Sequence, residues 1–89
     1  MVVRYADSGP SLSVREIHTW NRDDLTAPVM SASSGPKDYI KNQIYALFQQ
    51  RPAVYQVMMV RAGGPPFLLL RETGGWIDVT GSRVVMASE

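Results

Sequence analysis

Short apolar runs alternate with glycine-containing breaks between Pro52 and Met86, and this is the clearest pattern in the chain. The runs VYQVMMVR, FLLLRET, WIDVT and RVVMAS are rich in residues that suit the pleated surface of a sheet. The breaks contain Gly63-Gly64, Gly74-Gly75 and Gly81-Ser82, and glycine reaches positive φ at little steric cost. The pattern predicts a four-stranded antiparallel meander over about residues 53–87, with positive φ at Gly74 or Gly75 and at Gly81.

Counting outward from the turns predicts which side chains share a face, because directly opposed residues of an antiparallel pair point to the same side. A two-residue Gly74-Gly75 turn sets Arg71 opposite Asp78 as a cross-strand ion pair. A loop from Ala62 to Pro66 sets Arg61 opposite Phe67, whereas a loop of four residues would move the first strand's side chains to the other face. One face then carries Val54, Met58, Val60, Leu68, Leu70, Ile77, Val79, Val84 and Met86, and the other carries Tyr55, Val57, Met59, Phe67, Leu69, Arg71, Trp76, Asp78 and Val85.

A single helix is predicted over about residues 36–50. Pro36 suits the first helical turn, and Pro52 ends the helix because it disfavours helical geometry at the residue before it. Apolar residues recur at helical spacing and form one stripe, which consists of Ile40, Ile44, Leu47 and Phe48.

The N-terminal part of the chain predicts a β-hairpin. Residues 1–6 suit a short strand, residues 7–10 are rich in turn formers, and residues 11–20 alternate imperfectly between apolar and polar side chains. The segment from Asn21 to Gly35 has neither a helical nor a strand period, so it is predicted to be a connection with at most a short helical turn.

These elements predict a two-layer α+β fold in one domain that spans residues 1–89. The helix has one stripe to bury, and it is expected to cover the face that bears Leu68, Leu70, Ile77, Val79 and Met86. The second apolar face of the sheet needs another cover, because monomers rarely leave a large apolar patch in water. Either the N-terminal half of the chain or another chain is expected to cover it.

Composition narrows the class of protein further. Hydrophobic residues make up 45% and charged residues 19%, as in folded globular chains. The formal net charge is only +1, with scattered lysines and arginines, which disfavours binding to nucleic acid or to an anionic membrane. The chain has no cysteine, and no apolar run approaches the length of about 20 residues that a membrane span needs. We therefore expect a cytoplasmic, soluble protein without a cofactor.

The leading functional hypothesis is a small non-enzymatic interaction protein, of the adaptor or inhibitor type, that acts through its second apolar sheet face. The partner is expected to be a protein, and a homodimer would also cover this face. Tryptophan, tyrosine and arginine often dominate binding energy at such interfaces. The candidate interface residues are Tyr55, Met59, Phe67, Leu69, Arg71, Trp76 and Asp78.

Two other classes of function remain. The single histidine, His18, could form an acid/base pair with Asp23 or Asp24 in a small enzyme or ligand-binding domain, although a surface histidine at a strand end is the favoured explanation. Nucleic-acid binding is the third class, because sheet aromatics can stack bases, but basic residues do not surround these aromatics. No phosphate-binding glycine motif occurs in the chain.

Overall fold

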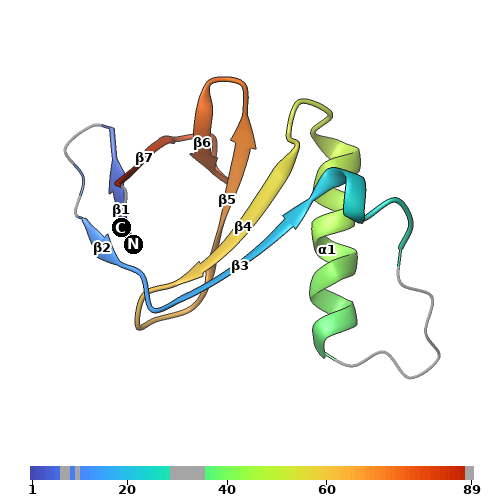
Figure 1. The fold of residues 1–89 in the computed structure, drawn as a ribbon, viewed down its shortest axis with the longest axis horizontal. Helices are drawn as coiled ribbons and strands as arrows, with labels where there is room; N and C mark the ends of the chain where they lie inside the picture. Colours follow the sequence, from blue (N-terminus) through green and yellow to red (C-terminus); the bar gives the residue numbers. More distant parts are fainter. Residues whose placement is uncertain (7–8, 10, 29–35, 88–89) are drawn as a thin grey trace.

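The computed structural model describes residues 1–6, 9, 11–28 and 36–87. Within them, seven strands form one antiparallel sheet and a single α-helix lies outside it (Figure 1). The α+β class is therefore confirmed. The elements in chain order are β1 (Val2–Tyr5), β2 (Leu12–Ser13), β3 (Glu16–Asn21), the 3-10 helix η1 (Arg22–Asp24), α1 (Pro36–Gln50), β4 (Gln56–Arg61), β5 (Phe67–Glu72), β6 (Gly75–Asp78) and β7 (Arg83–Ala87).

The two edge strands of the sheet are neighbours in the chain. The strand order is β2-β1-β7-β6-β5-β4-β3, yet only Val14 and Arg15 separate β2 from β3. The backbone N–H of Val14 donates to the carbonyl of Met1 over 2.9 Å, and that of Arg15 donates to the carbonyl of Arg61 over 2.8 Å. The chain thus passes directly from β1 to β4, and the sheet curls like an incompletely closed barrel (Figure 1).

A local irregularity accompanies this passage. Arg15 donates to the carbonyl of Arg61, and Glu16 is the register partner of the same Arg61. Two residues of one strand therefore oppose one residue of the other, which is the arrangement of a β-bulge. A bulge bends its strand, so it explains why the chain leaves β1 at this point.

The inner face of the curled sheet holds the first of two hydrophobic cores. Its buried residues come from β1, β4, β5 and β7, so β1 and β7 enclose the face that was expected to need a cover from the N-terminal half of the chain or from another chain. The buried residues are Val3, Met58, Val60, Leu69 and Val84, with Met1, Tyr5, Val14, Phe67, Trp76 and Met86 packed against them.

The second core lies between α1 and the outer face of the sheet. Its buried residues are Ile44, Phe48, Val54, Val57 and Leu70, with Trp20, Leu25, Ile40, Leu47, Leu68 and Ile77 packed against them. The predicted bounds of the helix and its apolar stripe are confirmed, as is its position over Leu68, Leu70 and Ile77. Val79, in contrast, is exposed in a turn, and Met86 belongs to the inner core.

Arg22 joins the end of β3 to this second core. Its Nε donates to the carbonyl of Val54 over 2.8 Å, and its Nη2 donates to the carbonyl of Arg51 over 2.9 Å. The guanidinium carbon also lies 4.9 Å from the centroid of the Phe48 ring. One half-buried side chain therefore satisfies carbonyls that follow α1 and covers the helix's most buried aromatic ring.

The predicted strand register was wrong in each hairpin. Val60 rather than Arg61 lies opposite Phe67, so Met58 and Val60 point inward while Val57 and Met59 face α1. Pro66, which would lie opposite Arg61, has no N–H to donate, and the pairing ends one residue earlier than predicted. The loop between Val60 and Phe67 has six residues, neither the five predicted nor the four of the alternative, and it moves Val57, Met58, Met59 and Val60 to the opposite faces while Val54 stays on the helix side.

In the other two hairpins, the position of the glycine sets the strand register. Glu72 pairs with Gly75, so Thr73 and Gly74 form the turn, and Arg71 lies opposite Trp76 instead of Asp78. Trp76 pairs with Val84, which moves Val84 and Met86 to the inner face. Positive φ is confirmed at Gly75 (105°) and Gly81 (94°), and in both places the glycine follows the turn as its bulge residue.

The strand arrangement also differs from the prediction. β4 to β7 are neighbours in chain order, but they form the middle of a seven-stranded sheet instead of a separate four-stranded meander. β1 and β2 pair as the predicted hairpin, whereas residues 16–21 join β4 at the opposite edge. Of the predicted connections, residues 7–8, 10 and 29–35 lie outside the described residues. In the described part, no helix has the length and hydropathy to span a bilayer.

Phe48→Ala should lower the free energy of unfolding by about 3–5 kcal/mol, because it removes a large, almost fully buried ring between α1 and the sheet. The neighbouring Gln49 is exposed, and Gln49→Ala should cost less than about 0.5 kcal/mol. Denaturant titration of both variants measures the difference. Equal and mild effects would contradict the observed orientation of the helix.

Gly75→Ala should lower the free energy of unfolding by about 1–2 kcal/mol, because an alanine at positive φ brings its Cβ too close to the following carbonyl oxygen. Gly64→Ala is a matched control: an added Cβ has open space around it at both positions, but Gly64 lies outside the positive-φ region. Thermal and denaturant unfolding should find the control nearly neutral. Similar losses for the two variants would show that conformation at Gly75 is not the cause.

Candidate functional site

Arg71 lies on the inner face of the sheet, at the end where the barrel is open. It is two residues from the buried Leu69 on β5, and its cross-strand neighbours are Gln56 on β4 and Trp76 on β6. The guanidinium carbon of Arg71 lies 5.5 Å from the Trp76 ring centroid and 5.6 Å from that of Tyr55. These distances are within the range of cation–π attraction, so Arg71 is held over two aromatic rings.

A row of hydrogen bonds extends from Arg71 to the end of β3. Nη1 of Arg71 donates to Oε1 of Gln56 over 3.2 Å, and Nε2 of Gln56 donates to Oδ1 of Asn21 over 2.9 Å. Nδ2 of Asn21 donates in turn to Oδ2 of Asp24 over 3.3 Å. The two amides are thereby oriented so that an acceptor oxygen faces the guanidinium group of Arg71.

The charge of Arg71 has no carboxylate partner among the described residues, where the one ion pair joins Arg61 to Glu16. The side chain is exposed and uses only Nη1 in the hydrogen bonds described for it. Its other N–H groups are therefore available to acceptors from outside the chain. We call Tyr55, Arg71 and Trp76 the aromatic–arginine cluster.

The predicted interface residues fall into separate environments. Tyr55, Arg71 and Trp76 come together at the open end, with Tyr55 exposed and Trp76 half-buried. Leu69 is 0% exposed and Phe67 packs against the same inner core, so neither forms an outer surface. Met59 lies on the helix side. Gln56 and Asn21, which carry no sequence signal for an interface, complete the polar row.

The carboxylate of Asp78 accepts hydrogen bonds from the turn that follows it. One carboxylate oxygen accepts the backbone N–H of Thr80 over 3.0 Å and of Ser82 over 2.9 Å, and it also accepts the hydroxyl of Thr80 over 2.6 Å. Burial alone would raise the pKa of Asp78, but these bonds and one from the Gly81 backbone stabilise the anion, so the net pKa is lowered. Burial, and then the charge and hydrogen bonding of Asp78, raise the pKa of Tyr5.

The predicted acid/base pair is not formed. The exposed His18 ring stacks with Trp20, with 6.3 Å between ring centroids and 29° between planes. No hydrogen bond or ion pair joins His18 to Asp23 or Asp24, and Asp24 bonds to Asn21 instead. Among the described residues, no three histidine, aspartate or glutamate side chains gather as metal ligands would.

His18 and Trp20 border an apolar groove on the helix side of the sheet. The groove encloses about 350 Å³ between β3, β4 and α1, and its lining residues are His18, Trp20, Ile40, Lys41 and Met59. A second hollow of about 200 Å³ continues from Ile40 and Met59 toward Leu68. This α1 groove is open and largely apolar, and it lies on the opposite face of the sheet from Arg71.

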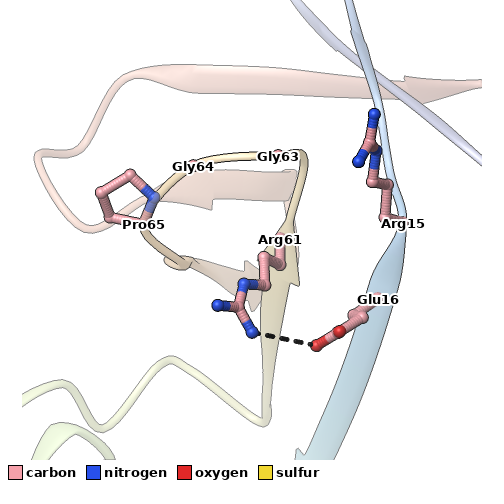
Figure 2. A pocket seen from close by; sticks show the side chains of 6 residues that line it. All are labelled: Arg15, Glu16, Arg61, Gly63, Gly64 and Pro65. Atoms are coloured by element: carbon pink, nitrogen blue, oxygen red, sulfur yellow. Dashed lines mark ion pairs between the residues drawn. The ribbon is translucent and has the colours of Figure 1, made fainter.

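A third hollow, of about 430 Å³, lies beside the loop between β4 and β5. Its lining includes Arg15 and Arg61, which suggests an anion site at first sight. Figure 2 shows, however, that the two guanidinium groups point in different directions. Arg61 is also paired with Glu16 at 3.6 Å, so its charge is already balanced. The two arginines do not converge on one ligand position.

The carboxylate of Asp78 should make stability depend on pH. Its pKa is lower in the folded chain, so its contribution is complete above the unfolded value of about 3.9 and is lost as the pH falls through the folded value. Asp78→Asn should therefore lower stability at pH 7 and flatten the loss of stability below about pH 4. Denaturant unfolding of both proteins at a series of pH values measures the slopes, and a slope for Asp78→Asn equal to that of the unchanged protein would contradict this role.

In comparisons with known proteins, no family model, no curated protein and no solved structure matches the chain.

Proposed function

We propose that this chain is a small non-enzymatic interaction protein, of the adaptor or inhibitor type, that binds a protein partner through the aromatic–arginine cluster. The observation that supports this most directly is the exposed guanidinium of Arg71, which lies over two rings and lacks a carboxylate partner among the described residues. Arginine, tryptophan and tyrosine are the residue types most enriched among those that dominate binding energy.

The cluster is also ordered before any partner arrives. A free arginine side chain loses up to about 2 kcal/mol of conformational entropy when it is fixed. Here Gln56 and the two rings already restrict Arg71, so binding would cost less of that entropy. The remaining N–H groups suit a carboxylate or a backbone carbonyl of the partner, and the rings supply apolar contact around it.

The chemistry of the cluster favours a protein over a nucleic acid. It contains one arginine, and the chain as a whole carries a formal net charge of +1. Nucleic-acid sites need several cations, because phosphate contacts supply most of their affinity. A cytoplasmic location and self-association as a homodimer belong to the same proposal.

Arg71→Ala should weaken binding of the partner by about 2 kcal/mol or more, which is the usual loss at a dominant interface residue. Affinity capture with the immobilised protein, followed by mass spectrometry, identifies the partner, and calorimetric titration of the purified pair gives the affinity. Arg71 is a better target than Trp76, because Trp76 also packs against the inner core.

Arg4→Ala is the matched control, since Arg4 is an exposed arginine on β1 next to the buried Val3. It removes the same charge outside the cluster and should bind the partner as the unchanged protein does. Arg71→Lys keeps the charge but loses the planar stacking, so an intermediate affinity is expected. If Arg71→Ala bound as tightly as Arg4→Ala, the cluster would not be the binding site.

A further inference from the structure

The outer edge of β3 is free of any strand in the part of the chain that the structure describes. β3 pairs with β4 from Glu16 to Asn21 in unbroken register, and it is the last strand of the sheet. The N–H of Arg22 donates to the carbonyl of Tyr55 over 3.0 Å, which makes Arg22 and Tyr55 a hydrogen-bonded pair. Because such pairs alternate, the backbone groups of Ile17, Thr19 and Asn21 point away from β4.

Lysine and proline, two residues that usually protect a sheet edge, are absent from β3, and Glu16 at its start is its one charged residue. Natural sheets use short strands, lysine, proline or a bulge to prevent pairing with another chain. β3 has six residues, EIHTWN, without lysine or proline, and its bulge lies before Glu16. Five of the six side chains are exposed, including Ile17 at 37%. The edge can therefore accept a further strand.

We propose that two copies of the chain pair antiparallel through β3, with a two-fold axis at Thr19, and so join their sheets into one. In this register Thr19 lies opposite the partner's Thr19, and Ile17 lies opposite the partner's Asn21. All the residues whose backbone groups point outward then meet, and they form about six interchain hydrogen bonds. Main-chain pairing of this kind is a common way for a sheet edge to bind a segment.

The side chains that lie opposite each other across the axis favour this register. On the helix side, His18 faces the partner's Trp20. His18 and Trp20 already stack within one chain, so the pairing gathers four rings. A register centred on His18 would instead place the Glu16 carboxylate opposite the partner's Trp20 and would lose the pairing of His18 with Trp20.

The α1 groove lies beside the same edge. His18 and Trp20 form its β3 border, and Ile40, Lys41 and Met59 form the rest. The pairing brings the partner's rings to the open side of this groove, where they cover apolar surface that faces solvent in the single chain. Arg71, on β5 and the opposite face of the sheet, takes no part. The pairing therefore rests on the self-association in the proposed function but uses a surface separate from the proposed partner site, so loss of one can be distinguished from loss of the other.

Analytical ultracentrifugation tests the pairing with the unchanged protein and two substitutions of the exposed Thr19, across about 1–100 μM, where a dimer of ordinary affinity dissociates. The unchanged protein should sediment as a dimer at the upper end of this range. Thr19→Lys sets like charges opposite each other across the axis and should raise the dissociation constant at least about tenfold. Thr19→Val, which suits a strand, should leave it unchanged.

Amide hydrogen exchange of the unchanged protein gives a second readout that does not depend on any variant folding. The amides of Ile17, Thr19 and Asn21 should exchange at least about tenfold more slowly at high than at low concentration. Those of His18 and Trp20 should be protected at both, because they bond to β4 within the chain. A monomer throughout, unchanged exchange at the three outward amides, or a Thr19→Lys dimer as tight as the original would each overturn the proposal.

Discussion

The short connection between β2 and β3 is the constraint on which the rest of the fold depends. Two residues cannot cross a flat seven-stranded sheet, so the sheet must curl until its first and last strands are adjacent. The bulge at Arg15 provides the bend, and the Arg61 carbonyl accepts the first N–H on the far side. This closure turns one sheet face into an interior, so β1 and β7 enclose Leu69 and Phe67. An apolar face can thus be buried without a second layer of helices.

The two faces of the sheet are buried in different ways. α1 packs its apolar stripe on the outer face and Arg22 ties the end of β3 to it, while the inner face packs against itself. Each core has a polar boundary where the packing ends: Arg22 at the helix side, and Asn21, Gln56 and Arg71 at the open end. Because no buried side-chain polar atom among the described residues lacks a hydrogen-bond partner, these boundaries are consistent with stable packing.

The sequence was sufficient for elements whose signals are local. Pro36, Pro52 and the spacing of Ile44 and Phe48 determined the helix, and the glycines marked each turn. The register was not local: it depended on Pro66 lacking an N–H and on Gly75 and Gly81 following their turns, and a shift of one residue on one strand exchanges its faces. Tyr55, Arg71 and Trp76 were therefore identified by residue type, whereas Gln56 and Asn21 required the observed pairing. The closure could not be predicted, because the bulge is set by contacts between Arg15 and Arg61, which are far apart in the chain.

Incomplete closure also explains why the two proposed surfaces exist at all. β2 pairs with β1 over two residues, whereas β3 pairs with β4 over six. Most of β3 therefore extends past the point where β1 could cover it, and the backbone groups of Ile17, Thr19 and Asn21 are left at an edge. Because the barrel is not fully closed, the inner face is also open beyond the core, where Arg71 lies with its two rings. Leu12 and Ser13 of this bent segment pair with β1, whereas the outer edge of β3 has no strand beside it among the described residues, so both proposed surfaces lie on the side of the bend away from β1.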